Sequence, residues 1–281
     1  MIEPKCWGIF RETSHSPGRE DDDAAILRAT ASKLEARGFN VSLISAENAA
    51  EPLATREPRI FSMCEQHQVI DTLLKAEQDG AVIVNRPQSV INTYRHHTVE
   101  LFGKADVPAP ASRVVAADPR QAAPDTPVWV KRYDFHATQA DDVLFADTSE
   151  TWQKALKNFA DRGIPFVIVQ DHVPGDLIKF YGVHHPHVSA PSWFVWFYHR
   201  DQTLAHHVFE EGLLRDTASM AASALGVEIF GGDAIVGADG QPMIIDLNAW
   251  PSFALYRDDA SNAIAEHLHW RFNRQAATAV G

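Results

Sequence analysis

Cysteine is scarce in this chain: Cys6 and Cys64 are the only two among 281 residues. Two cysteines are too few for a disulfide framework, and their scarcity fits a reducing compartment. No apolar run approaches the roughly 18 residues that a membrane-spanning helix needs. Residues 1–5 also lack the apolar core of a signal peptide. We therefore expect a cytoplasmic protein without a membrane segment.

Basic runs are missing as well. The formal net charge is −12, and no run of five basic residues occurs. Nucleic-acid binding normally requires a basic face, so the charge argues against a nucleic-acid partner. Apolar residues make up 45% and charged residues 22% of the chain, which is typical of a globular protein. Its length predicts one enzyme-sized unit or two to three subdomains, and is compatible with a homodimer.

The segment 243–253, MIIDLNAWPSF, is the most informative motif. Its apolar start predicts a buried strand. Asp246 and Asn248 are two residues apart, so in an extended strand both side chains point the same way. Pro251 ends the strand close to this pair. Two oxygen ligands on one face of a rigid strand suit Mg²⁺, which takes few protein oxygens and leaves room for phosphates.

A second strand is predicted upstream, at 231–236, and it contains Asp233. A Gly/Asp-rich turn at 237–240 folds the two strands into a hairpin. The hairpin then carries three candidate metal ligands, Asp233, Asp246 and Asn248. The alternative is an ordinary hairpin with an exposed aspartate and a hydrogen-bonded asparagine.

Two further predicted strands carry lysines. Residues 128–131 form an apolar strand that ends in Lys131, and a strand that begins at residue 177 contains Lys179. Between them, the apolar run 166–171 leads into a polar hinge and a Pro-Gly-Asp turn. Each lysine either holds a phosphate as a point charge or extends its charged end into solvent.

This order of motifs resembles the ATP-grasp superfamily, in particular its RimK-like and inositol-trisphosphate 5/6-kinase-like members. In that family one lysine precedes a glycine-rich lid and another lies near the hinge. An apolar strand leads into the adenine-contacting hinge, and an acidic hairpin completes the site. The resemblance covers roughly residue 85 to the C-terminus. It implies an α/β (α+β) fold of ATP-grasp type, in which two α+β subdomains sandwich ATP after a small N-terminal parallel α/β subdomain.

The resemblance also implies roles for these residues. Lys131 and Lys179 would be the catalytic lysines and would contact the nucleotide phosphates. Asp233, Asp246 and Asn248 would hold one or two Mg²⁺ ions, for which Mn²⁺ could substitute.

Nucleotide contacts are implied at the hinge, at Gln170, Asp171 and Val173. Adenine recognition there would rely mostly on backbone groups, so the side chains carry little information. Asp176 would either accept hydrogen bonds from the ribose hydroxyls or act only as a turn aspartate.

The predicted lid, residues 134–142, departs from the family pattern. No glycine lies between Lys131 and Gly163, so coverage of the phosphates by backbone N–H groups is in doubt. Either the side chains of His136 and Thr138 would contact the phosphates instead, or the loop would be less mobile than a glycine-rich lid. Arg132 is a weaker candidate for the same role.

The N-terminal third has a βαβ pattern that predicts a small parallel sheet with helices. Its polar loop at 11–23 follows a strand, where α/β folds place ligands. We predict three parts: an N-terminal subdomain at 1–95, a central subdomain with the lid at 96–165, and a C-terminal subdomain with the metal hairpin at 166–281.

Several other motifs have simpler interpretations. The histidine-rich segment 184–187 resembles a transition-metal site, but neighbouring strand residues face opposite ways, so a polar loop near the acceptor is favoured over zinc. Cys64 and His67 show a C-x-x-H spacing without partners, which a buried cysteine explains. The aromatic run 193–198 predicts a core strand, with a ring in the acceptor pocket as the alternative.

Together these motifs predict a Mg²⁺- and ATP-dependent phosphoryl-transfer enzyme. Three functions follow from the resemblance. The favoured one is a carboxylate–amine (or thiol) ligase that forms an acyl phosphate on a small molecule or peptide, which the acidic net charge supports. A hydroxyl kinase is the second, because Asp246 and the aromatic residue before Pro251 are similar to the inositol-phosphate branch. A nucleotide-binding regulator is the third, because the lid is unusual.

Overall fold

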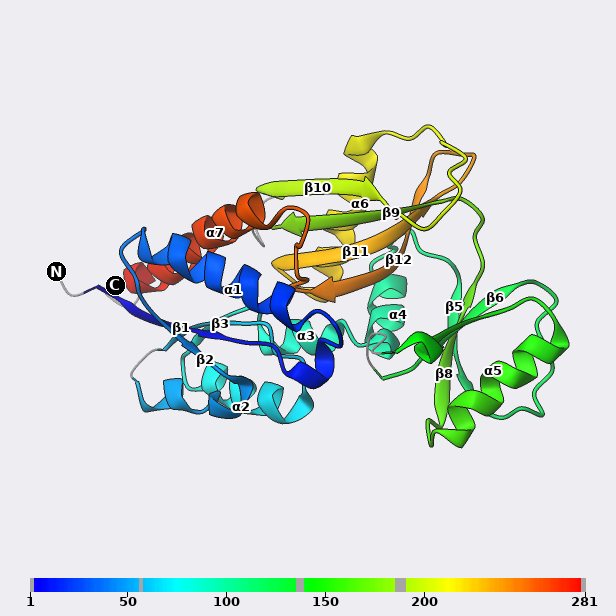
Figure 1. The fold of residues 1–281 in the computed structure, drawn as a ribbon, viewed down its shortest axis with the longest axis horizontal. Coiled ribbons are helices and arrows are strands. Elements are labelled where there is room, and N and C mark those ends of the chain that lie inside the picture. Colours follow the sequence, from blue (N-terminus) through cyan, green and yellow to red (C-terminus); the bar gives the residue numbers. More distant parts are fainter. Residues whose placement is uncertain (1–2, 56–57, 135–138, 185–190, 279–281) are drawn as a thin grey trace.

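The computed structural model describes residues 3–55, 58–134, 139–184 and 191–278. Three four-stranded sheets follow one another along this part of the chain (Figure 1). The first sheet is parallel and the other two are antiparallel. This mixed α/β architecture confirms the predicted fold class.

The parallel sheet has the strand order β2-β1-β3-β4. Its strands are β1 (Lys5–Ile9), β2 (Asn40–Ile44), β3 (Arg59–Ser62) and β4 (Val82–Val84). Parallel neighbours need long crossovers, and these contain α1 (Glu20–Glu35), α2 (His67–Gln78) and the short 3-10 helices η1 (Thr13–His15), η2 (Ala46–Asn48) and η3 (Glu51–Ala54).

The C-terminal helix α7 (Arg257–Thr278) returns to this first sheet, where it lies beside α1 (Figure 1). Ile26 and Leu34 of α1 form one buried cluster with Leu268 and Phe272 of α7 and with Phe61 of β3. Helix α2 packs on the opposite face of the sheet. The end of the chain therefore stabilises its beginning.

The second sheet has the order β5-β8-β6-β7, with β5 (Ser112–Ala116), β6 (Val128–Arg132), β7 (Val143–Ala146) and β8 (Phe166–Asp171). The 3-10 helix η4 (Ala140–Asp142) precedes β7, and α5 (Ser149–Asp161) covers one face. Val128 and Val130 are buried against α5. Side chains alternate along a strand, so Lys131 lies on the other face.

The third sheet has the order β10-β9-β11-β12, with β9 (Asp176–Val183), β10 (Trp193–Tyr198), β11 (Ile229–Val236) and β12 (Pro242–Ala249). Helix α6 (Glu211–Leu225) packs on one face, where Phe180 and Phe230 are buried with Leu214. Helices α3 (Pro87–Asn92) and α4 (Arg95–Lys104) connect the first sheet to the second.

Most predicted elements are present, with two differences. The aromatic run 193–198 is a strand as expected, but β10 is at the edge of its sheet and all six residues are only half-buried. Strand β8 pairs with β5 and β6, so it belongs to the second sheet. We keep the three-part division as a proposal and place its second boundary after β8. In the part of the chain that the structure describes, no helix is long and apolar enough to cross a membrane.

Candidate functional site

The register of the third sheet brings the predicted metal ligands onto one face. Asp233 of β11 lies directly opposite Asp246 of β12, and Gly231 lies opposite Asn248. Directly opposed residues of antiparallel strands share a face, and so do residues two apart on one strand. Asp233, Asp246 and Asn248 therefore form a cluster of two carboxylates and one amide.

Glycine at position 232 allows the two strands to approach closely at this cluster. A Cβ atom there would lie 2.4 Å from the carbonyl oxygen of Asp246 and 2.6 Å from the ring of Phe180. Any larger residue would push β11 away from β12 and separate Asp233 from Asp246.

Lys179 extends the same row onto β9, because it lies opposite Asp233. Its Nζ donates a hydrogen bond to Oδ1 of Asp233 at 2.7 Å. Burial raises the pKa of Asp233; the charge of Lys179 opposes that rise and the charge of Asp246 adds to it. The site therefore favours additional positive charge.

Lys131 reaches the hairpin from the second sheet. Its Nζ donates to the carbonyl oxygen of Ile245 at 3.0 Å, although the residue lies on β6. Burial lowers its pKa to about 8, while the negative charge of Asp246 opposes the decrease. The lysine therefore links the two sheets at the position of the acidic cluster.

Arg95 was not a candidate from the sequence. It begins α4, it is buried, and its Nη1 donates to the carbonyl oxygen of Arg132 at 3.3 Å. Its Nε is buried without a hydrogen-bond partner in the described part of the chain. Arg95, Lys131 and Asp246 line one cavity of about 210 Å³ between the second and third sheets. Two cations thus face this cleft.

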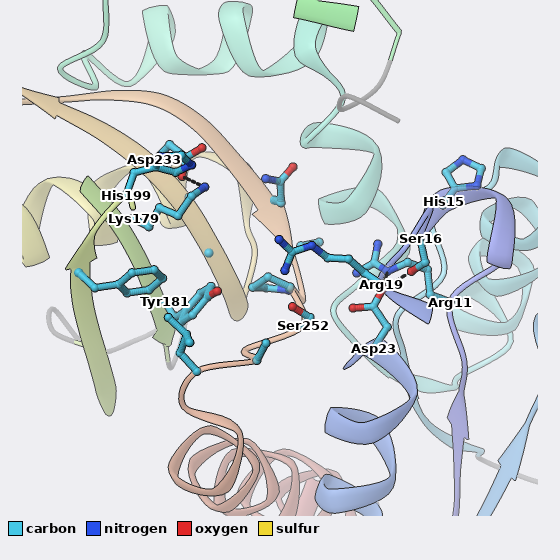
Figure 2. Close-up of a pocket in the computed structure, with 18 of the residues that line it drawn as sticks. Arg11, His15, Ser16, Arg19, Asp23, Lys179, Tyr181, His199, Asp233 and Ser252 are labelled. Atoms are coloured by element: carbon cyan, nitrogen blue, oxygen red, sulfur yellow. Dashed lines mark hydrogen bonds and ion pairs between the residues drawn. The ribbon is translucent and has the colours of Figure 1, made fainter. Parts of the chain in front are cut away.

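A larger pocket of about 670 Å³ opens on the other side of the acidic cluster. Figure 2 shows Lys179, Tyr181 and Asp233 on one side of it and Arg11, Arg19 and other residues of the N-terminal segment on the other. Asn248 also lines this pocket, whereas Asp246 lines the cleft. The acidic hairpin therefore borders both spaces.

The residues predicted at the hinge are only partly brought to the cleft. Gln170 lines it, and its Nε2 donates to Ser112 Oγ at 3.2 Å. Asp171 instead lies 3.6 Å from Nη1 of Arg113, and neither Asp171 nor Val173 lines the two spaces described above.

Asp176 holds a neighbouring loop through hydrogen bonds to its backbone. Its two carboxylate oxygens accept hydrogen bonds from the backbone N–H groups of Ala205 (2.7 Å) and His207 (2.8 Å). Burial raises the pKa of Asp176, but these two hydrogen bonds and the charges of His207 and His206 together outweigh burial, so the net shift is downward. The contacts favour the turn role over the ribose role.

The remaining candidates have other surroundings. Arg132 pairs with Asp134, with Nη2 donating to Oδ2 at 2.9 Å. His136 and Thr138 lie outside the described residues, as do residues 185–187 of the histidine-rich segment. Burial raises the pKa of the Cys64 thiol, which donates to the carbonyl oxygen of Phe10. The ring of His67 packs edge-on against Tyr94.

The acidic cluster fits a hard divalent cation. Two carboxylates and an amide oxygen are the donors that Mg²⁺ takes, and a cation would offset the repulsion between Asp233 and Asp246. In the described part of the chain, no group of three or more His, Cys, Asp or Glu residues offers a transition-metal site.

The chain is similar to known proteins in structure and not in sequence. No family model and no curated protein matches the sequence. Among solved structures, a RimK-domain ATP-grasp protein from Sphaerobacter thermophilus is 15% identical, with 93% of this chain and 98% of that chain covered and a TM-score of 0.68.

Two further structures are also similar. The D-alanine–D-alanine ligase from Bacillus anthracis, complexed with ATP, is 10% identical, with 98% and 99% of the two chains covered and a TM-score of 0.70. The ATP-grasp ligase PsnB, complexed with a precursor variant, Mg and ADP, is 14% identical, with 96% and 99% covered and a TM-score of 0.64. At these identities the likeness establishes the architecture: this chain has the ATP-grasp fold.

Proposed function

We propose that the protein is a Mg²⁺- and ATP-dependent ligase that joins a carboxylate to an amine (or thiol) through an acyl phosphate. One observation carries the proposal: the acidic hairpin lies between a narrow cleft with two cations and a wider pocket. A ligase of this type needs a nucleotide site and an acceptor site that meet at the transferred phosphoryl group. The ligase and ATP complexes among the structural relatives support the same assignment.

The nucleotide belongs in the cleft between the second and third sheets. Arg95 and Lys131 supply positive charge to its phosphates, and Gln170 lies among the lining residues of the same cleft. Both cations are buried, so their interaction with phosphate is little screened by water. The unpartnered Nε of Arg95 gains an acceptor when a phosphate binds.

Asp233, Asp246 and Asn248 would hold Mg²⁺. A bound ion would supply positive charge against the charge that develops on the phosphates during transfer. Lys179 neutralises Asp233 from the opposite side and faces the wider pocket, where it can orient an acceptor carboxylate.

The reaction balances without a nucleophilic side chain. A carboxylate oxygen of the first substrate attacks the γ-phosphorus of ATP, and the bond to the β-phosphate oxygen breaks to release ADP. The amine of the second substrate then attacks the acyl carbon, inorganic phosphate leaves, and the amine loses a proton. The protein contributes position, charge and exclusion of water, which protects the acyl phosphate from hydrolysis.

A product analysis tests the proposal. With a carboxylate and an amine that stimulate turnover, ADP and inorganic phosphate should form in equal amounts. With the carboxylate and hydroxylamine, a hydroxamate should accumulate, because hydroxylamine intercepts acyl phosphates. A stable phosphorylated acceptor without free phosphate would favour the hydroxyl kinase, which the Asp246 motif supports. Tight ATP binding without turnover for any acceptor would favour a nucleotide-binding regulator.

A further inference from the structure

Some of the charged side chains that line the wider pocket form ion pairs with each other, and one does not. Asp23 and Glu65 both contact Arg11, whose Nε lies 3.0 Å from Oδ2 of Asp23. Asp233 is paired with Lys179. Arg11 is therefore shared by two acids, and Lys179 is taken up by a third.

Arg19 differs from these cations. It precedes α1 and lines the pocket on the side opposite Lys179, as Figure 2 shows. Within the described residues it forms no ion pair and no side-chain hydrogen bond, so its guanidinium is available to a ligand. At the rim, Arg200 is exposed and its neighbour Asp201 carries the opposite charge, so together they add no net charge.

Part of the pocket wall is apolar. Tyr181 and Phe197 both line the pocket, and their ring centroids are 5.4 Å apart. Leu255 at the edge is 53% exposed. Tyr181 and Phe197 lie in the same strand rows as the acidic cluster, because β9 and β10 continue the sheet. The apolar surface thus runs alongside the proposed reaction centre.

Arg19 is close enough to this wall to affect it electrostatically. Burial raises the pKa of Tyr181, and the positive charge of Arg19 opposes that rise. Arg19, Tyr181 and Phe197 all line this one pocket, so a single ligand can contact the guanidinium and the aromatic rings at the same time.

We propose that Arg19 binds the non-reacting carboxylate of an apolar amino acid, which serves as the amine substrate of the proposed ligase. The guanidinium fork matches a carboxylate in shape and charge, and within the described residues the Arg19 side chain has no acidic partner that would compete with the substrate. The apolar side chain packs against Tyr181 and Phe197. A pocket of about 670 Å³ suits such a small substrate together with the activated carboxylate.

The chemistry follows from this orientation. The carboxylate stays on Arg19 unchanged, while the amino group faces the acidic cluster and attacks the acyl phosphate. The new C–N bond forms as the bond from the acyl carbon to the phosphate oxygen breaks, and the displaced proton goes to solvent. This substrate class rests on the proposed ligase function.

Binding measurements test the inference. L- and D-leucine and L- and D-phenylalanine would be titrated by calorimetry in the presence of Mg²⁺ and a non-hydrolysable ATP analogue. Each amino acid is compared with its carboxamide, which lacks the negative charge. At least one amino acid should bind about tenfold or more tightly than its carboxamide, because a charge-assisted hydrogen-bond pair is lost.

Arg19→Ala should abolish that preference, and Arg19→Lys should restore part of it. The matched control is Arg28→Ala, which removes the same charge from α1 but lies over the ring of Phe10; it should keep the preference. Equal binding of acids and carboxamides, no binding of any of the four acids, or an unchanged preference in Arg19→Ala would overturn the inference. Binding of the ATP analogue alone is measured separately, and its failure would instead contradict the proposed function.

Discussion

Nζ of Lys179 lies 2.7 Å from Oδ1 of Asp233, on adjacent strands and on the face that carries the other candidate metal ligands. The lysine therefore holds a positive charge at the position where a cation is proposed. A variant without this lysine shows how much Lys179 stabilises the metal-free protein. It also shows whether a bound metal ion can replace the lost charge.

Lys179→Met should destabilise the metal-free protein on the order of 1–2 kcal/mol, because a partly buried carboxylate loses its partner. Excess Mg²⁺ should recover more stability in the variant than in the wild type, since the ion replaces the missing charge. The measurement is the midpoint of thermal unfolding with EDTA and with Mg²⁺. Lys157→Met, which breaks an exposed pair with Asp161, is the control and should show neither effect. An equal Mg²⁺ effect in all three proteins would contradict the metal assignment.

Asp246→Asn should reduce ATP turnover by at least about two orders of magnitude with the fold intact, because transition-state charge loses its neutralisation. The matched control is Asp239→Asn, which makes the same change in the turn of the same hairpin, where Oδ1 accepts from the backbone N–H of Gln241. Steady-state kinetics and circular dichroism check the two variants. Near-normal turnover in a folded Asp246→Asn protein would contradict the role of the hairpin.

The hairpin could be predicted from sequence because its information is local. The alternation in β11 and β12 and the turn between them determine which side chains share a face, and the observed register agrees. The same holds for Lys131 at the end of an apolar strand. Each of these positions depends on a few neighbouring residues.

The parts that could not be predicted depend on tertiary packing. Arg95 reaches the cleft because the start of α4 contacts β6, which follows it in the sequence by more than thirty residues. The carboxylate of Asp176 is occupied by hydrogen bonds because a loop distant in sequence, which contains Ala205, folds back onto it. No periodicity within either segment indicates these contacts.

Asp176→Ala distinguishes the turn role from the ribose role. It should lower the free energy of unfolding by about 1–3 kcal/mol, because two backbone N–H groups lose their acceptor. The affinity for a fluorescent ATP analogue should change less than about twofold. Urea unfolding and equilibrium binding give the two numbers. A large loss of ATP affinity with normal stability would instead support a ribose contact.

The pH dependence of stability tests the burial of Lys131. The folded-state pKa of Lys131 is about 8, below the ordinary lysine value of 10.5 that applies to the unfolded chain. Between these two values the unfolded chain binds more protons, so this lysine makes the free energy of unfolding rise with pH. Below pH 8 its destabilising effect is fully present. The rise should be on the order of 3 kcal/mol and should be missing in Lys131→Met.

Urea unfolding of wild type and Lys131→Met at pH 7.5 and pH 10 measures this difference, because other titrating groups cancel between the two proteins. Lys157→Met serves again as the exposed control and should follow the wild type. Phosphates in the cleft stabilise the charged lysine, so bound ATP should reduce the rise in the wild type alone. Wild type and Lys131→Met changing equally with pH would show that the lysine is solvated, and would remove Lys131 from the proposed phosphate site.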